Sequence, residues 1–190
     1  MRNINDIFLD RTIYKFKDKS VDLKILHQIY DVMKLGPTSR NSLPLRIIFV
    51  HSLEAKQRLE NCVMEGNISK VKSAPLVALF AYDTEFYKLM DKTNPVSPEM
   101  KNYFSSSEIV ALDSAIRNST LQAAYFSMIA RGYGLDCGPM SGFDPKKIEQ
   151  EFLSGTNYKI NYICNLGYRD GENPYPRLPR LDFDEVCTLV

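Results

Sequence analysis

The stretch SSSEIVALDSAIRNSTLQAAYFSMIAR, residues 105–131, is the longest helical pattern in the chain and decides how the other elements can be arranged. Ser105 is followed three residues later by Glu108, which resembles a capping box and predicts a helix that starts there. Apolar residues surround much of the predicted cylinder: Ile109, Leu112, Ile116, Leu121, Ala124, Tyr125, Met128 and Ile129. A helix that is apolar over so wide an arc is expected to be buried centrally or at a subunit interface.

Two apolar runs before this helix are typical of buried strands. Leu45–Val50 is short, β-branched and largely apolar, and residues 76–82 form a similar run. Ser52 opens an amphipathic helix between the two runs. Prolines then break residues 84–104 into a mixture of helices and turns.

A helix and a polar loop precede the first of these strands. Ser20 is a candidate cap for a helix through Leu35, and Pro37 prevents that helix from continuing. The loop GPTSRN, residues 36–41, carries hydroxyl and amide groups that can bond a heterocycle or a sugar. Pro, Ser and Asn are also ordinary turn residues, so the loop alone leaves both interpretations open.

The last third of the chain contains one more helix and one more strand. Asp144 is a cap and Pro145 a first residue for a short helix that ends near Gly155, and residues 158–166 alternate as a third strand. From residue 169 the chain is polar and rich in proline and arginine. Since strands and helices do not alternate at the spacing of βαβ units, we expect an α+β fold.

Length, charge and cysteine content restrict the class of protein. With 190 residues, we expect a single domain over residues 1–190 or one protomer of an intertwined dimer. A net charge of +1 gives no electrostatic excess for nucleic acid. No segment has the pattern of a secretory signal or the roughly 20 apolar residues of a membrane span, so we expect a cytoplasmic protein. The four cysteines are scattered, so we expect them to be reduced and a zinc site is poorly supported.

Arginines near both ends of the chain are candidate phosphate ligands. Arg11 with Thr12 offers a guanidinium and a hydroxyl, and the segment RLPR, residues 177–180, adds Arg177 and Arg180. The same residues also occur on solvated basic surfaces.

Two other polar groups lie between apolar elements, where ligands are usually held. Asn67 and Lys70 are spaced to share one face of a helical turn, although an exposed pair of this kind normally has no function. The small residues of GPMSGF, residues 138–143, let a flat ring approach the backbone, or else serve a tight connection. Rossmann, Walker, HExxH and Ser-His-Asp patterns are absent from the sequence.

Taken in order, these blocks resemble the FMN-dependent nitroreductase superfamily. Its members open with an arginine-containing phosphate motif, followed by a Pro-Ser/Thr-Ser-x-Asn-x-x-Pro loop that stands here as PTSRNSLP, residues 37–44. The resemblance covers nearly the whole chain and is closest to the branch of the malonic semialdehyde reductase of pyrimidine degradation. The blocks that carry the finer resemblance are KLGPTS (34–39), RNS (117–119), QAAY (122–125), GPMSGFD (138–144) and RLPRL (177–181).

The resemblance implies a nitroreductase-like α+β fold, with a central antiparallel or mixed sheet flanked by helices, in an intertwined homodimer. Two FMN sites lie at the interface of such a dimer, and each is assembled from both chains. The implied FMN ligands are Arg11, Thr12, Asn67, Lys70, Pro139, Met140, Ser141, Gly142, Arg177 and Arg180 from one chain, and Pro37, Thr38, Ser39, Asn41 and Asn118 from its partner. Arg11 and Arg177 are expected at the phosphate, and the amides of Ser141 and Gly142 near flavin N5.

The implied activity is ping-pong hydride transfer from NADH or NADPH through flavin N5 to a small-molecule acceptor. Lys70 is expected to act in catalysis by stabilising negative charge on the reduced ring. The acceptor is a small aldehyde such as malonic semialdehyde, for which Arg40 and Arg117 are candidate anchors, or else a nitroaromatic or quinone. A more distant alternative is a flavin-binding module without turnover.

Three positions depart from the family pattern. Tyr14 stands where many relatives have a second basic residue, Ser141 where they have an acidic one, and Leu45 where an aromatic residue usually follows the loop proline. These departures bear on the acceptor, because the backbone contacts to FMN do not depend on them.

Overall fold

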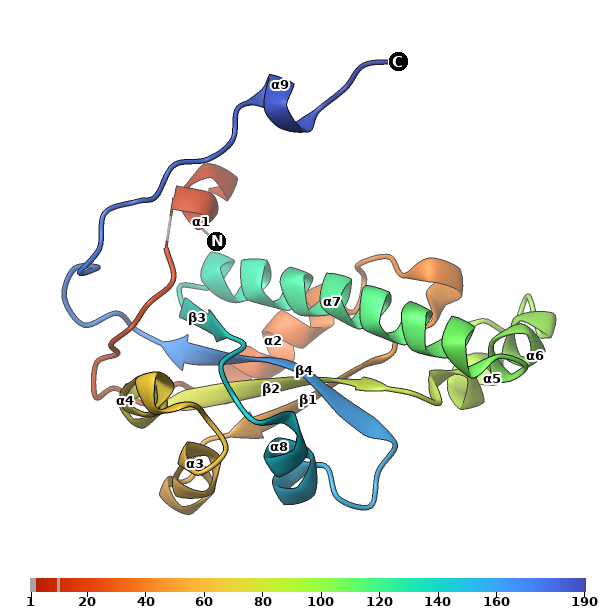
Figure 1. Cartoon of the computed structure of the whole chain (residues 1–190), viewed down its shortest axis with the longest axis horizontal. Helices are drawn as coiled ribbons and strands as arrows, with labels where there is room; N and C mark the ends of the chain where they lie inside the picture. Colours follow the sequence, from red (N-terminus) through yellow and green to blue (C-terminus); the bar gives the residue numbers. More distant parts are fainter. Residues whose placement is uncertain (1–2, 10) are drawn as a thin grey trace.

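A four-stranded antiparallel sheet forms the centre of the molecule (Figure 1). The computed structural model describes residues 3–9 and 11–190, with only the backbone of Ile4; Met1, Arg2 and Asp10 lie outside the described residues. The strands follow the spatial order β1-β2-β4-β3, with β1 Leu45–Val50, β2 Leu76–Asp83, β3 Asp136–Met140 and β4 Tyr158–Gly167. Neighbouring strands are antiparallel throughout, as the predicted α+β class allows.

The strand β3 was not predicted. Gly138, Pro139 and Met140 were expected in a connection, but they pair with β4, with Gly138 opposite Asn165. The expectation of a loop is therefore wrong for these three residues. Glycine and proline have low strand propensity, and proline is tolerated here because β3 is at the edge of the sheet, where one row of N–H groups is unpaired.

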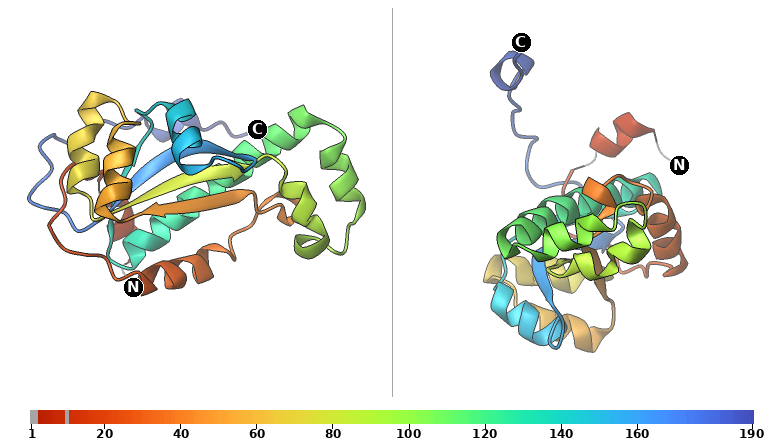
Figure 2. Two further views of the ribbon diagram at one scale, coloured as in Figure 1. Left: turned by 90° about the horizontal axis from the view of Figure 1, so that it is seen from below. Right: turned by 90° about the vertical axis from the view of Figure 1, so that its right-hand side faces the viewer.

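Helices cover both faces of the sheet (Figure 1). On one face lie α2 Lys24–Met33 and α7 Glu108–Gly132, and on the other lie α3 Leu53–Glu60, α4 Glu65–Ser73 and α8 Pro145–Phe152. Beyond one end of the sheet lie the 3₁₀ turn η2 Phe86–Leu89, α5 Met90–Thr93 and α6 Glu99–Ser105. The short helix α9 Phe183–Val186 stands apart from this body (Figure 2), whereas α1 Ile4–Leu9 contacts α7, where the Arg131 guanidinium donates to the Ile7 carbonyl at 3.3 Å.

Two predicted helix starts are wrong. Ser107, not Ser105, caps α7 by accepting from the Val110 amide at 3.5 Å, because Ser105 is the last residue of α6. The helix α2 begins at Lys24 without a side-chain cap, so Ser20 does not cap it.

Two other predicted starts are confirmed. The Ser52 hydroxyl accepts from the Ala55 amide at 3.1 Å at the start of α3. The Asp144 carboxylate accepts from the Lys146 amide at 3.0 Å at the start of α8, which has Pro145 as its first residue. A polar oxygen on the capping residue satisfies amides that have no partner inside the helix.

The long helix α7 packs small residues and one phenylalanine against the sheet. Ala123, Phe126 and Ala130 are fully buried, and the Phe126 ring lies 5.4 Å from Phe80 and 5.9 Å from Phe49. Small side chains let the helix approach the strands closely, and Phe126 fills the remaining space.

Large apolar side chains lie on the opposite side of α7. Ile109 is 81% exposed, and Leu112, Ile116 and Leu121 are also exposed. Burial at the centre of the protomer is therefore the wrong expectation for this stripe. The other expectation was burial at a subunit interface, and an exposed apolar stripe is compatible with it.

The cysteine prediction is confirmed for all four residues. Cys62, Cys137 and Cys164 are buried and Cys187 is exposed, and each is a free thiol. Burial raises the pKa of Cys62, so this thiol stays protonated at neutral pH. In the part of the chain that the structure describes, no helix is both long and apolar enough to cross a membrane.

Replacing Phe126 by alanine is expected to lower the free energy of unfolding by about 3–5 kcal/mol, because it leaves a cavity between α7 and the sheet. Denaturant titration followed by circular dichroism measures this change. Leu53→Ala is the control, since Leu53 is 73% exposed, and a change within about 0.5 kcal/mol is expected there. Equal effects of the two substitutions would contradict the packing described for Phe126.

Candidate functional site

The tail of the chain is held against the first described residues by two arginines. The Arg11 guanidinium donates to the carbonyl of Tyr175 at 2.5 Å and to that of Pro176 at 2.9 Å. The Arg177 guanidinium donates to the carbonyl of Leu9 at 2.5 Å. The two predicted phosphate ligands are thus brought together from opposite ends of the sequence, and each keeps further N–H donors for an anion.

Thr12 belongs to the same group, whereas Arg180 does not join it. The Asn173 side chain donates to the Thr12 carbonyl at 2.8 Å, which fixes the backbone beside Arg11. The Arg180 guanidinium donates at 3.0 Å to the carbonyls of Leu178 and Pro179, its own neighbours in the chain.

A second group forms on α4. The Lys70 ammonium donates to the Asn67 side-chain oxygen at 2.8 Å, so the two residues share one helix face as predicted. The same ammonium lies 5.0 Å from the centroid of the Tyr14 ring. Because the Tyr14 ring contacts the Tyr175 ring at 5.5 Å, Tyr14 links α4 to the arginine group.

The segment after β3 closes against α4. The Asn67 amide donates to the Gly142 carbonyl at 2.9 Å, and a Cβ at position 142 would lie only 2.5 Å from the Asn67 nitrogen. Only glycine fits there without displacing Asn67. The backbone amides of Ser141 and Gly142 donate to no other described residue, so both remain available for a ligand. We call Arg11, Thr12, Asn67, Lys70, Ser141, Gly142 and Arg177 the first half-site.

The polar loop after α2 is anchored to the middle of α7. Its residues Ser39–Asn41 form a 3₁₀ turn, and the Ser39 amide donates to the Asn118 side-chain oxygen at 2.8 Å. The buried Asn118 amide nitrogen donates to the Ser114 carbonyl at 2.8 Å, so its orientation is fixed from both ends. We call Pro37, Thr38, Ser39, Asn41 and Asn118 the second half-site.

This loop contains backbone conformations that side-chain-bearing residues rarely adopt. The φ angle is 53° at Arg40, 53° at Asn41 and 43° at Leu43. For residues such as Arg and Leu this region costs about 1–2 kcal/mol each. Hydrogen bonds hold the turn, including that from the Leu43 amide to the Thr38 hydroxyl at 3.3 Å. Strain held in this way is frequent at ligand sites.

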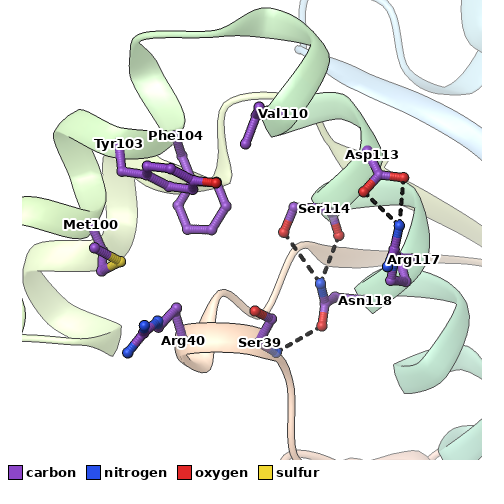
Figure 3. Close-up of a pocket in the computed structure, with 10 residues that line it drawn as sticks. All are labelled: Ser39, Arg40, Met100, Tyr103, Phe104, Val110, Asp113, Ser114, Arg117 and Asn118. Atoms are coloured by element: carbon purple, nitrogen blue, oxygen red, sulfur yellow. Dashed lines mark hydrogen bonds and ion pairs between the residues drawn. The ribbon is translucent and has the colours of Figure 1, made fainter.

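A pocket of about 470 Å³ opens beside the second half-site (Figure 3). Arg117 donates two bonds, at 2.9 and 2.7 Å, to the Asp113 carboxylate, which neutralises its charge. The residues that line the pocket are Ser39, Arg40, Met100, Tyr103, Phe104, Val110, Asp113, Ser114, Arg117 and Asn118.

The two half-sites lie apart in one chain. Asn41 donates from its side chain to the carbonyl of Thr93 at 2.5 Å, which ties the second half-site to α5. Lys70 and Asn67 lie on α4, and both views place α4 and α5 toward opposite ends of the sheet (Figures 1 and 2). One protomer therefore presents two separate sets of polar groups.

The family model described as "Nitroreductase family" matches residues 11–168, which include both half-sites apart from Arg177. The chain belongs to the nitroreductase family. Members of this family are NAD(P)H-dependent flavin oxidoreductases that use FMN. The finer resemblance to malonic semialdehyde reductase is not reproduced among the relatives described next.

Relatives of this nitroreductase-family chain carry names of the same kind. It is 47% identical over 175 residues to the NADH dehydrogenase/NAD(P)H nitroreductase HadB of Ralstonia pickettii, covering 91% of this chain and 89% of the relative. It is 42% identical over 180 residues to an NADH dehydrogenase/NAD(P)H nitroreductase from Stutzerimonas stutzeri, covering 95% of this chain and 91% of the relative.

Solved structures share the fold of this family member. A Bacillus subtilis nitroreductase, ydfN, superposes with a TM-score of 0.87 at 20% identity over 98% of both chains. A nitroreductase from Exiguobacterium sibiricum, crystallised in complex with FMN, superposes with a TM-score of 0.86 at 18% identity over 100% of this chain and 98% of the other. These likenesses confirm the nitroreductase-like fold.

Gly142→Ala is expected to lower the free energy of unfolding by about 1–3 kcal/mol, because the new Cβ displaces the Asn67 amide. Hydrogen exchange of the Met64 amide, which donates to the Gly142 carbonyl at 3.0 Å, should accelerate as well. Gly66→Ala is the control on α4, since a Cβ there meets nothing within 4 Å and alanine favours the helix. Unchanged exchange at Met64 in Gly142→Ala would refute the close approach.

Proposed function

We propose that this chain is a single-domain FMN-dependent NAD(P)H oxidoreductase, over residues 1–190, that completes its cofactor site only as a homodimer. The observation that carries the proposal is the separation of two half-sites, each with ligand-binding groups but located toward opposite ends of the sheet. A second copy can bring the second half-site of one chain to the first half-site of the other. Two equivalent FMN sites follow from the symmetry of such a dimer.

The first half-site has the donors that FMN requires. Arg11 and Arg177 lie together and suit a phosphate dianion, since guanidinium groups bind phosphate through paired N–H bonds. The unpaired amides of Ser141 and Gly142 suit a ring nitrogen or oxygen. The resemblance adds Pro139 and Met140 to this wall, and Arg180 to the region of the phosphate.

A bound FMN would supply the redox chemistry for hydride transfer, in the ping-pong reaction that we propose between NADH or NADPH and a small acceptor. Lys70 is the catalytic residue that we assign, because its ammonium can stabilise negative charge that develops on the ring. The bond from Lys70 to Asn67 fixes the position of this charge in advance. No side chain acts as a nucleophile in this scheme.

For the acceptor, we propose a small aldehyde of the malonic semialdehyde kind. The blocks shared with that branch, among them GPMSGFD at residues 138–144, support this choice, and so does the guanidinium of Arg40 in the pocket. A nitroaromatic or quinone acceptor is the second candidate. The aromatic walls of Tyr103 and Phe104 favour it, as do the names of the relatives.

Two surfaces support the homodimer. The stripe of Ile109, Leu112, Ile116 and Leu121 along α7 is uncovered, and a second copy would bury it. The chain after Arg177 extends away from the body (Figure 2), and its large apolar side chains Leu178, Leu181, Phe183, Val186, Leu189 and Val190 are exposed.

A groove of about 970 Å³ between α2 and the edge strand β1 suits the tail of a partner. Its floor is apolar, with Met33, Phe49 and Phe126, and among the described residues that line it there is no carboxylate. Lys92 lines it without an ion pair among the described residues, whereas Lys34 pairs with Asp31 at 2.6 Å. The segment 181–190 carries three acidic residues and no basic one. Apolar and charge complementarity thus support an intertwined dimer.

The deciding experiment reduces the purified, FMN-loaded protein anaerobically with NADH and with NADPH, then reoxidises it with aldehydes, quinones and nitroaromatics. We expect a nicotinamide to bleach the flavin. We then expect an aldehyde acid to reoxidise it faster than occurs in oxygen-free buffer without acceptor. A yellow protein that neither nicotinamide bleaches would be a flavin-binding module instead. Reoxidation by nitroaromatics and quinones alone would favour the second acceptor class.

Lys70→Ala is expected to slow flavin reduction by about a hundredfold, since one charge-stabilising donor is lost. Stopped-flow absorbance of the FMN-loaded variant measures the rate at saturating NADH or NADPH. Lys72→Ala is the matched control, because Lys72 is on the same helix but pairs with Glu60 at 3.4 Å. An equal rate for Lys70→Ala and Lys72→Ala would remove Lys70 from its assigned role.

Ile116→Glu is expected to weaken the dimer at least about tenfold and to lower FMN retention in parallel, because it places a charge in the apolar interface. Light scattering across a dilution series and the FMN content after gel filtration measure the two effects. Val96→Glu is the control, since Val96 is 87% exposed and lies outside α7. A monomeric variant that still retains FMN fully would show that one chain suffices.

A further inference from the structure

Arg40 is a basic residue in the pocket whose charge is not neutralised within the described part of the chain. We propose that Arg40 is the specificity residue of this enzyme and selects acceptors that carry an anionic group, a carboxylate above all, next to the reducible group. The inference rests on the proposed function and deepens it. It applies to either acceptor class, because it concerns the anionic group and not the group that is reduced.

The backbone presents Arg40 in a conformation set before any ligand binds. Its φ of 53° and ψ of 25° lie in the left-handed region, which arginine rarely adopts. The turn is closed by the Asn41 amide bonding to the Thr38 carbonyl and the Ser42 amide bonding to the Ser39 carbonyl, both at 3.1 Å. A side chain that starts from so constrained a backbone loses less freedom on binding than one on a mobile loop.

The charges in the pocket are not equivalent. Arg117 is bound through two bonds to Asp113, so it is a poor anchor for a further anion. In the described residues, no carboxylate lies within ion-pair distance of Arg40. Figure 3 shows Arg40 and the Asp113–Arg117 pair on opposite sides of the pocket. An incoming carboxylate therefore has one free guanidinium to bind.

The position of Arg40 links this charge to the reaction. Arg40 lies between Ser39 and Asn41 of the second half-site, so both of its neighbours in the chain are proposed cofactor ligands. Across the pocket, the rings of Tyr103 and Phe104 and the Met100 side chain give an apolar wall for the body of the acceptor. An apolar wall with one cationic corner matches a small, flat or short molecule with a carboxylate at one end.

The phosphates of NADH or NADPH are another source of negative charge for the same guanidinium. The two half-reactions of a ping-pong enzyme can be measured separately, so the experiment can distinguish the sources. Flavin reduction by NADH and NADPH reports on the reductant, and reoxidation of the reduced enzyme reports on the acceptor.

The experiment compares matched acceptors with the FMN-loaded dimer: para-nitrobenzoate against para-nitrobenzamide, and succinic semialdehyde against butanal. Each pair differs mainly in one negative charge. The variants are Arg40→Gln and Arg40→Lys. The controls are the double variant Asp113→Asn/Arg117→Gln, which removes the neutralised pair, and Arg58→Gln, which removes an arginine that pairs with Glu151 outside the pocket.

The expected result is a preference of the native enzyme for the anionic member of each active pair, measured as the ratio of kcat/KM values. Arg40→Gln should reduce that ratio about 10- to 100-fold, as expected for loss of a charge-assisted bond. Arg40→Lys should restore part of it, and Asp113→Asn/Arg117→Gln and Arg58→Gln should leave it within about twofold. Added salt should also lower the ratio, since Arg40 is exposed.

Three outcomes would overturn the proposal. An unchanged ratio in Arg40→Gln would remove its role, and loss of the ratio in Asp113→Asn/Arg117→Gln alone would transfer the role to that pair. Slowed flavin reduction in Arg40→Gln with an unchanged acceptor ratio would assign Arg40 to the reductant's phosphates. An enzyme that reduces none of the four acceptors refutes the proposed function instead, which the flavin-bleaching assay shows independently.

Discussion

The packing of α7 along the sheet is the constraint on which the rest of the structure depends. The helix is rigid, and its residues Asn118 and Gly132 are about 21 Å apart along the axis at a rise of 1.5 Å per residue. Asn118 holds the loop of the second half-site, while the chain beyond Gly132 enters β3 and then the segment around Gly142. The helix thus helps to position both half-sites, and their separation within a protomer follows from the sheet as a whole, with α4 and α5 toward its opposite ends.

The same helix divides its side chains by size. Small residues and Phe126 face the sheet and allow close packing, whereas Ile109, Leu112 and Ile116 face outward. In a helix that served only one protomer, the larger side chains would be the more favourable ones to bury. The arrangement makes sense if the outer face is buried by a second copy, and it connects the core of the protomer with the completion of the proposed FMN site.

The first half-site depends on contacts between distant parts of the chain. Arg11 and Arg177 are held by carbonyls of each other's segments, and Tyr14 joins them to Lys70 on α4. The second half-site is built locally, from a strained turn and one buried asparagine. The pocket beside that turn contains Arg40, which has no ion-pair partner among the described residues, and Arg117, which is paired with Asp113. Selection of the acceptor is therefore assigned to the second half-site.

The sequence alone determined those features that depend on local patterns. Hydrophobic periodicity predicted the long helix and the strands β1, β2 and β4, and polar caps predicted the starts of α3 and α8. The order of short polar motifs led to the nitroreductase resemblance, because ligand-binding loops keep their residue types wherever they lie in space. The three-residue spacing of Asn67 and Lys70 was enough to place both on one helix face.

Only the tertiary structure decided which residues meet. Gly138, Pro139 and Met140 form a strand because β4 offers them a partner, despite their low strand propensity. The roles of Asn173 and Tyr175 beside Thr12 and Arg11 left no signal in the sequence, since a contact across more than 160 positions has no local pattern. The separation of the two half-sites is likewise a property of the packed helix and sheet: spacing along a chain specifies local geometry, and packing alone specifies distance in space.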